Sequence, residues 1–190
     1  MEARLGFLAP EEGNGFWLEV PGKAPSKGSF KIVSARGNPS KSILLSQTPG
    51  PMAEFDGRVR YVAARDWERR VTRQWLEVIE KCKPISVAYF VHVTRPRSHY
   101  HKPRGATEMT LKPNAPQFPT GTPDLDKMQR AVNDTLVECR MMPDDRFIVE
   151  AYAKRRFSSE NRMLIVVREG PDPSAIDLAR FDPESGRSDA

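Results

Sequence analysis

The sequence lacks the features that mark membrane, secreted and zinc-knuckle proteins. Its 190 residues contain no apolar run close to the roughly 18 residues of a membrane span, so a membrane protein is not expected. The first fifteen residues lack the basic start and apolar stretch of a secretory signal, which favours an intracellular protein. The two cysteines, Cys82 and Cys139, lack Cys-x-x-Cys spacing, so we expect buried thiols rather than a disulfide framework or a zinc knuckle.

Positive charge is concentrated in the first 170 residues. The whole chain has 30 Lys plus Arg against 25 Asp plus Glu, and residues 171–190 hold five of these acids and two of the bases. The remainder therefore carries 28 bases against 20 acids, a net charge of +8. Such a basic body favours a polyanionic partner, most commonly nucleic acid, although a basic protein without such a partner has the same charge.

One folded domain is expected between two poorly ordered ends. Residues 1–15 are predicted to be a flexible leader and residues 16–170 a single domain. Residues 171–190 form an acidic, Pro-rich tail with few large apolar side chains, so we predict that it is disordered. Six prolines among residues 96–123 predict a long loop, and loops of this length are usually functional or mobile.

The apolar pattern predicts a small mixed sheet flanked by two main α-helices, an α/β domain of α+β-like character. Strands are expected at residues 16–20, 29–33, 85–93, 147–157 and 162–168, and amphipathic helices at 62–82 and 125–139. The last two strands are expected to pair as a hairpin. The first helix has an arginine-rich outer surface, and it is a candidate dimer interface because Trp67 and Trp75 are costly to expose.

Acidic side chains gather at the start of the second helix and in the turn after it. Asp124 and Asp126 stand at the helix start, Asp134 shares a helical face with Asp126 and Arg130, and Asp144-Asp145 precede the next strand.

Carboxylates that converge repel one another unless a hard divalent cation such as Mg²⁺ binds them. A cation held in this way suits phosphate chemistry. Helix capping and an ordinary turn explain the same acids without any function.

The spacing of these residues resembles a known family signature. It consists of Pro123-Asp124-Leu125-Asp126, Arg130, Ala131-Val132, Asp134, and Asp144-Asp145 followed by Ile148-Val149. This pattern resembles that of the RusA family of Holliday junction resolvases, and the Pro- and Gly-rich residues 21–28 are similar to that family's first turn. The resemblance implies a RusA-like fold and a homodimeric, Mg²⁺-dependent endonuclease, for which Mn²⁺ can substitute. It also implies cleavage of four-way DNA junctions in recombination and repair, in the cytoplasm of a bacterial host if a phage encodes the protein.

The resemblance also implies roles for single residues. The family's metal-binding aspartates fall on Asp124, Asp126 and Asp145, and its functional lysine falls on Arg130, while Asp134 and Asp144 match as accessory residues. Because a guanidinium stays protonated, Arg130 cannot shuttle a proton, and we favour a role in holding the phosphate. The expected DNA-binding residues are Lys23, Lys27, Lys127 and either Lys154 or Arg155.

Two other functions fit the same sequence. A non-catalytic architectural protein could recognise DNA junctions without cutting them, if the aspartates hold no metal. A metal-dependent hydrolase of small phosphate esters would use the same acids, but the net charge of +8 disfavours it.

Overall fold

Both strands and helices form in the part of the chain that the computed structural model describes, residues 2–25, 31–35, 38–45, 50–105, 107–121 and 124–171. The strands are β1 Arg4–Phe7, β2 Gly15–Pro21, β3 Lys31–Ala35, β4 Asn38–Leu45, β5 Ile85–Thr94, β6 Tyr100–His101, β7 Thr110–Leu111, β8 Ile148–Ser158 and β9 Arg162–Glu169. The helices are α1 Gly50–Val62, α2 Glu68–Arg70, α3 Arg73–Glu80 and α4 Leu125–Glu138. Short helical turns are η1 Pro10–Glu12, the π-helical η2 Ala63–Trp67, η3 Arg97–His99 and η4 Asp145–Phe147.

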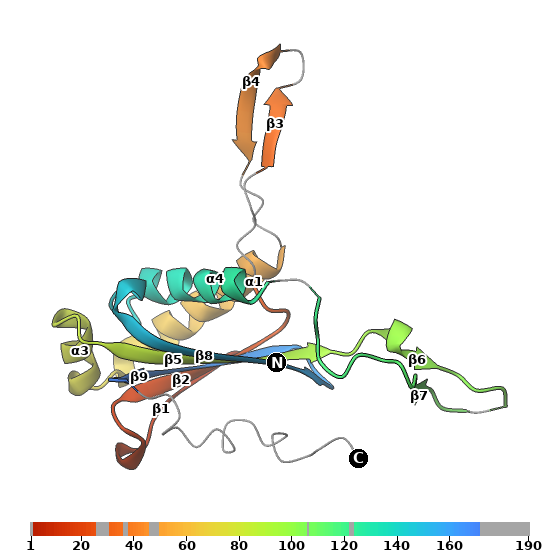
Figure 1. The fold of residues 1–190 in the computed structure, drawn as a ribbon. Coiled ribbons are helices and arrows are strands. Elements are labelled where there is room, and N and C mark those ends of the chain that lie inside the picture. The colour runs from red at the N-terminus through yellow and green to blue at the C-terminus, as the bar shows by residue number, and fades with distance from the viewer. Residues whose placement is uncertain are drawn as a thin grey trace.

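A five-stranded mixed sheet forms the centre of the described structure. Its strand order is β1-β2-β9-β5-β8, with β5 parallel to β8 and the other neighbouring pairs antiparallel. The helices α1 and α4 lie along one face of this sheet (Figure 1). This arrangement confirms the expected mixed sheet flanked by helices. In the same described residues, no helix has the length and apolar character needed to cross a membrane.

The hairpin expected from the last two strands is wrong. β8 and β9 each pair with β5, which lies between them. Residues 85–92 are buried on both faces of the sheet, so β5 takes a central position, whereas β8 is largely exposed or half-buried and forms the edge. The link between β8 and β9 passes the end of β5, where the Asn161 side chain accepts a hydrogen bond of 2.9 Å from the Thr94 backbone N–H.

The first residues are not the flexible leader that the sequence predicts. β1 pairs with β2 through its whole length, and the side chains of Ala3 and Leu5 are buried in the core. Burial of these apolar side chains offsets the entropy of ordering an edge strand. The acidic tail beyond residue 171 and Lys27 lie outside the described residues.

The helix expected over residues 62–82 is interrupted at residues 71–72, and its helical region begins earlier, at Gly50: α1, η2 and α2 follow one another without a gap, and α3 is separate. α2 ends at Arg70, and Thr72 then adopts an extended backbone and starts α3, with its hydroxyl accepting a hydrogen bond of 3.1 Å from the Trp75 N–H. Cys82, expected to be buried, is exposed just after α3, in the left-handed region with φ of 49°. The amphipathic pattern therefore predicts the helical character but not the break.

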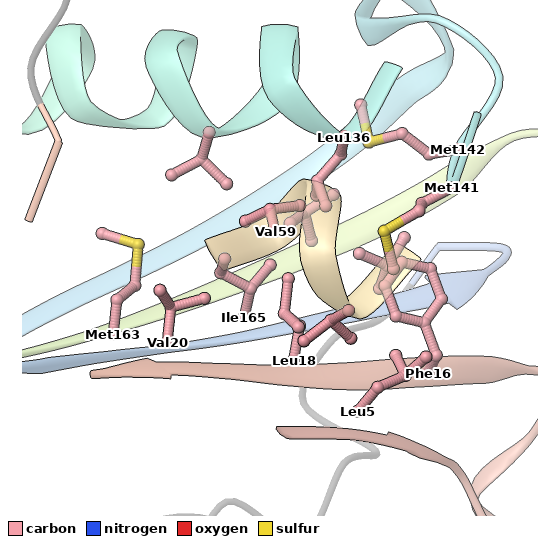
Figure 2. Packing of buried hydrophobic residues seen from close by; sticks show 14 of the residues in the cluster. Leu5, Phe16, Leu18, Val20, Val59, Leu136, Met141, Met142, Met163 and Ile165 are labelled. Atoms are coloured by element: carbon pink, nitrogen blue, oxygen red, sulfur yellow. The ribbon is translucent and has the colours of Figure 1, made fainter. Parts of the chain in front are cut away.

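The main core fills the space between the sheet and the helices α1 and α4 (Figure 2). Its almost inaccessible side chains include Phe16, Leu18, Val20, Val59, Leu136, Met141, Met142, Met163 and Ile165. Trp67 and Trp75 belong to the same core, at 4% and 0% exposed, and their rings contact Phe16. These tryptophans therefore give no reason to place a dimer interface on this part of the chain.

Candidate active site

The start of α4 presents two carboxylates to solvent. Asp124 is the residue before the first helical turn, with an extended backbone, and its carbonyl accepts a hydrogen bond of 3.1 Å from the Met128 N–H. Its side chain makes no capping hydrogen bond and forms an ion pair of 2.9 Å with Lys127, which raises the pKa of that lysine. Asp126 is exposed in the first turn. Side-chain capping therefore does not account for Asp124.

The buried face of α4 orients the rest of the helix. Met128, Val132 and Leu136 lie in the core, so Arg130, which is exposed, stands on the outer side of α4. Asp134 is half-buried and has an interaction partner. The motif thus lies along a helix whose polar side stays accessible.

A polar contact joins α4 to the centre of the sheet. The buried Tyr89 of β5 donates a hydrogen bond of 2.5 Å to the side-chain oxygen of Asn133. Burial raises the pKa of Tyr89, Asn133 opposes the shift, and the negative charge of Asp145 adds to it. Asp145 is therefore close enough to interact electrostatically with the hydroxyl that Asn133 binds. The sequence did not predict the contact between Tyr89 and Asn133, because a single tyrosine in an apolar strand does not indicate which polar group its hydroxyl will bind.

The second acidic pair stands at the start of η4, which contacts α4: Asp144 caps the turn and Asp145 is its first residue. Asp144 accepts a hydrogen bond of 3.1 Å from the Arg146 N–H, and this bond lowers the pKa of Asp144. Asp145 is exposed beside it, and the two aspartates also interact with each other. The ordinary turn expected for Asp144 is therefore present, while Asp145 takes no part in that cap.

The structure brings the two acidic segments to one helix but does not bring all three proposed ligands together. Asp145 lies near the contact between Tyr89 and Asn133, whereas Asp126 is at the start of α4. Residues 126 and 133 are separated by about 10 Å along the helix axis, because a helix rises 1.5 Å per residue. Among the described residues, no group of three His, Cys, Asp or Glu side chains could hold a metal ion as arranged. The carboxylates have the chemistry that a hard divalent cation prefers, but their present arrangement is not a closed site.

The strand register separates the two alternatives for the basic residue on β8. Arg155 pairs with Val91, whose side chain belongs to the core under α4. The Arg155 guanidinium donates a hydrogen bond of 2.8 Å to the carbonyl of Gly121, just before α4. Lys154 pairs with Phe90 and points to the opposite face of the sheet. Arg155 is therefore the basic residue close to the start of α4. Lys23 is exposed after β2.

Comparison with known families gives one finding that covers this whole region. The family model described as endodeoxyribonuclease RusA matches residues 39–168. The match includes α4, η4, β8 and every proposed site acid. No curated protein matches the chain.

Proposed function

Because the chain belongs to the RusA endodeoxyribonuclease family, we propose that it resolves four-way DNA junctions during recombination and repair, with Mg²⁺ as its cofactor. The chain is thus a hydrolase that acts on DNA. The observation that supports the finer proposal is the coverage of the family match, which contains both acidic segments and Arg130. The net charge of +8 over residues 1–170 is consistent with a DNA substrate and disfavours a small phosphate ester.

We propose that Asp124, Asp126 and Asp145 hold the divalent ion, with Asp134 and Asp144 as accessory residues. The exposure of all three carboxylates and the contact of η4 with α4 support this assignment, and Asp145 would have to approach the start of α4 to share an ion with Asp124 and Asp126. A bound Mg²⁺, or Mn²⁺ in its place, would polarise a phosphate oxygen and make an attacking water more acidic. The ion pair between Asp124 and Lys127 would have to open for Asp124 to become a ligand.

The basic residues have a separate task in this proposal. Arg130 donates two parallel hydrogen bonds to oxygens of the scissile phosphate and stabilises the charge that develops there. Lys127, once released from Asp124, contacts the DNA backbone, and Arg155 keeps the segment before α4 in place through the Gly121 carbonyl. Two subunits related by a two-fold axis would present one such site to each of two opposed strands.

The test is cleavage of a mobile four-way junction beside a linear duplex of matched sequence. We expect paired nicks in opposed strands of the junction with Mg²⁺ or Mn²⁺, little cleavage of the duplex, and no cleavage in EDTA. Equal nicking of both substrates would indicate a general nuclease. Tight junction binding without nicking at any Mg²⁺ concentration would favour the architectural protein, and failure of the junction to compete with a simple phosphodiester would favour the small-ester hydrolase.

Substitution of Arg130 separates its two chemical roles. Arg130→Gln should lower junction cleavage about 100-fold, because a preorganised donor to the developing charge is lost. Arg130→Lys keeps the charge but not the bidentate fork, so we expect an intermediate rate and an unchanged pH profile. Cleavage by Arg130→Lys that exceeds the wild-type rate, with a new limb in the pH–rate profile, would show that this position acts as a general acid instead.

A further inference from the structure

A basic arm projects from the end of the sheet that carries the start of α4. The arm comprises residues 95–105 and 107–121, which leave β5, extend outward with β6 and β7, and return to α4 (Figure 1). Its return brings the chain to Gly121, three positions before Asp124. The arm is therefore continuous in the chain with the proposed metal ligands.

The base of the arm is held by specific contacts. The Arg95 guanidinium donates a hydrogen bond of 2.7 Å to the Pro116 carbonyl and stacks 4.1 Å from the centre of the Phe157 ring. His99 meets the same ring edge-on, and its carbonyl accepts a hydrogen bond of 2.9 Å from the Lys112 N–H. Arg155 fixes the other end through Gly121. These contacts join both strands of the arm to β8.

The arm carries far more positive than negative charge. Over residues 95–121 the sequence has five bases, Arg95, Arg97, Lys102, Arg104 and Lys112, and one acid, Glu108. Arg97, Lys102 and Arg104 are exposed. A projecting arm with a net charge of +4 has the electrostatic character that a nucleic-acid backbone attracts.

The arm also exposes three large apolar side chains, out of the seven that are exposed among the described residues. Met109 is 52% exposed, Leu111 46% and Phe118 58%, although the described core buries most large apolar residues. Apolar side chains next to basic ones are the combination with which proteins contact unstacked bases. A four-way junction offers such bases where its strands exchange, whereas a continuous duplex does not.

We propose that the arm is a second DNA-binding surface, which grips a duplex arm of the substrate beside the branch point. Its basic side chains contact phosphates, and Met109 and Leu111 lie against the bases at the branch. This inference rests on the proposed function, because it takes the branched substrate from there. It adds a surface outside the acidic motif that sets where the scissile strand lies relative to α4.

A pair of charge-matched variants tests the basic part. Arg104→Gln combined with Lys112→Gln removes two charges from the arm, and Arg69→Gln combined with Arg73→Gln removes two from α2 and α3, at the other end of the sheet (Figure 1). With the full chain in EDTA, we expect the arm variant to raise the Kd for the junction about tenfold. The slope of log Kd against log salt should fall by about 1.8, at 0.9 per lost phosphate contact. The control variant should change Kd less than twofold.

The outcomes separate this proposal from the function on which it rests. Equal Kd values and salt slopes for the arm and control variants overturn the arm, even if the wild type cuts junctions. Weakened binding by the arm variant supports the arm, even if the wild type binds junctions without cutting them.

The apolar part has its own test. Met109→Ser combined with Leu111→Ser should reduce the preference for junction over matched duplex about fivefold, whereas Leu76→Ser, an exposed leucine of α3, should not. Unchanged preference, or a change in oligomeric state alone by light scattering, overturns the apolar contact and marks these residues as a protein interface.

Discussion

Asp124→Asn is expected to abolish junction cleavage, by about 10³-fold or more, while junction binding stays within about threefold of wild type. Asparagine has nearly the same shape as aspartate but carries no charge, so it should preserve the start of α4 and fail as a ligand for a hard cation. The substitution should not disturb the start of α4, because the Asp124 side chain makes no capping hydrogen bond. Loss of its ion pair with the exposed Lys127 should cost little stability.

Asp126→Asn and Asp145→Asn should behave in the same way if the three carboxylates act on one ion. The measurement is single-turnover cleavage, together with Mn²⁺ binding followed by electron paramagnetic resonance. Glu80→Gln, an exposed acid at the end of α3, is the matched control and should leave both unchanged. Asp145→Asn that keeps full Mn²⁺ binding and cleavage would remove η4 from the site and leave α4 without a third ligand.

The sequence predicts some elements well because their signals are local. β5 and α4 have clear apolar periodicity, and both form close to their expected ends. The position of β5 between β8 and β9 depends instead on competition among strands for the centre of the sheet, which a short turn such as residues 158–161 does not reveal. The same limit applies at Thr72, where a single capping residue divides a continuous amphipathic pattern.

The site residues likewise divide into those that a local sequence pattern identifies and those that depend on how distant segments pack. The spacing of the motif identifies the acids, and the family match covers them. The choice between Lys154 and Arg155 needs the register of β8 on β5, because alternate residues of a strand point to opposite faces. How close Asp145 comes to Asp124 depends on the packing of the turn after α4, which involves contacts with residues far away in the sequence.

Trp75→Ala should have the largest effect on stability, a loss of about 3–5 kcal/mol in the free energy of unfolding. The Trp75 ring is fully buried against Phe16, and removal of the ring leaves a cavity in the main core. Leu76→Ala, at the next position of α3 but exposed, should cost less than about 1 kcal/mol. Denaturant unfolding followed by circular dichroism compares the two variants with wild type.

Trp75→Phe extends this test to the site. The Trp75 indole N–H donates a hydrogen bond of 2.8 Å to the Met141 carbonyl, and Met141 and Met142 lie in the core directly before the turn that carries Asp145. Phenylalanine keeps most of the apolar contact but leaves this buried carbonyl unpaired, at a cost of about 1–3 kcal/mol. At a temperature where the variant is fully folded, we expect junction cleavage to fall about tenfold, because a small displacement of a catalytic group is costly. Junction binding should be unchanged, since the basic arm is far from this contact. If Trp75→Phe is less stable but cleaves junctions at the wild-type rate, Trp75 stabilises only the core, and the position of Asp145 does not depend on it.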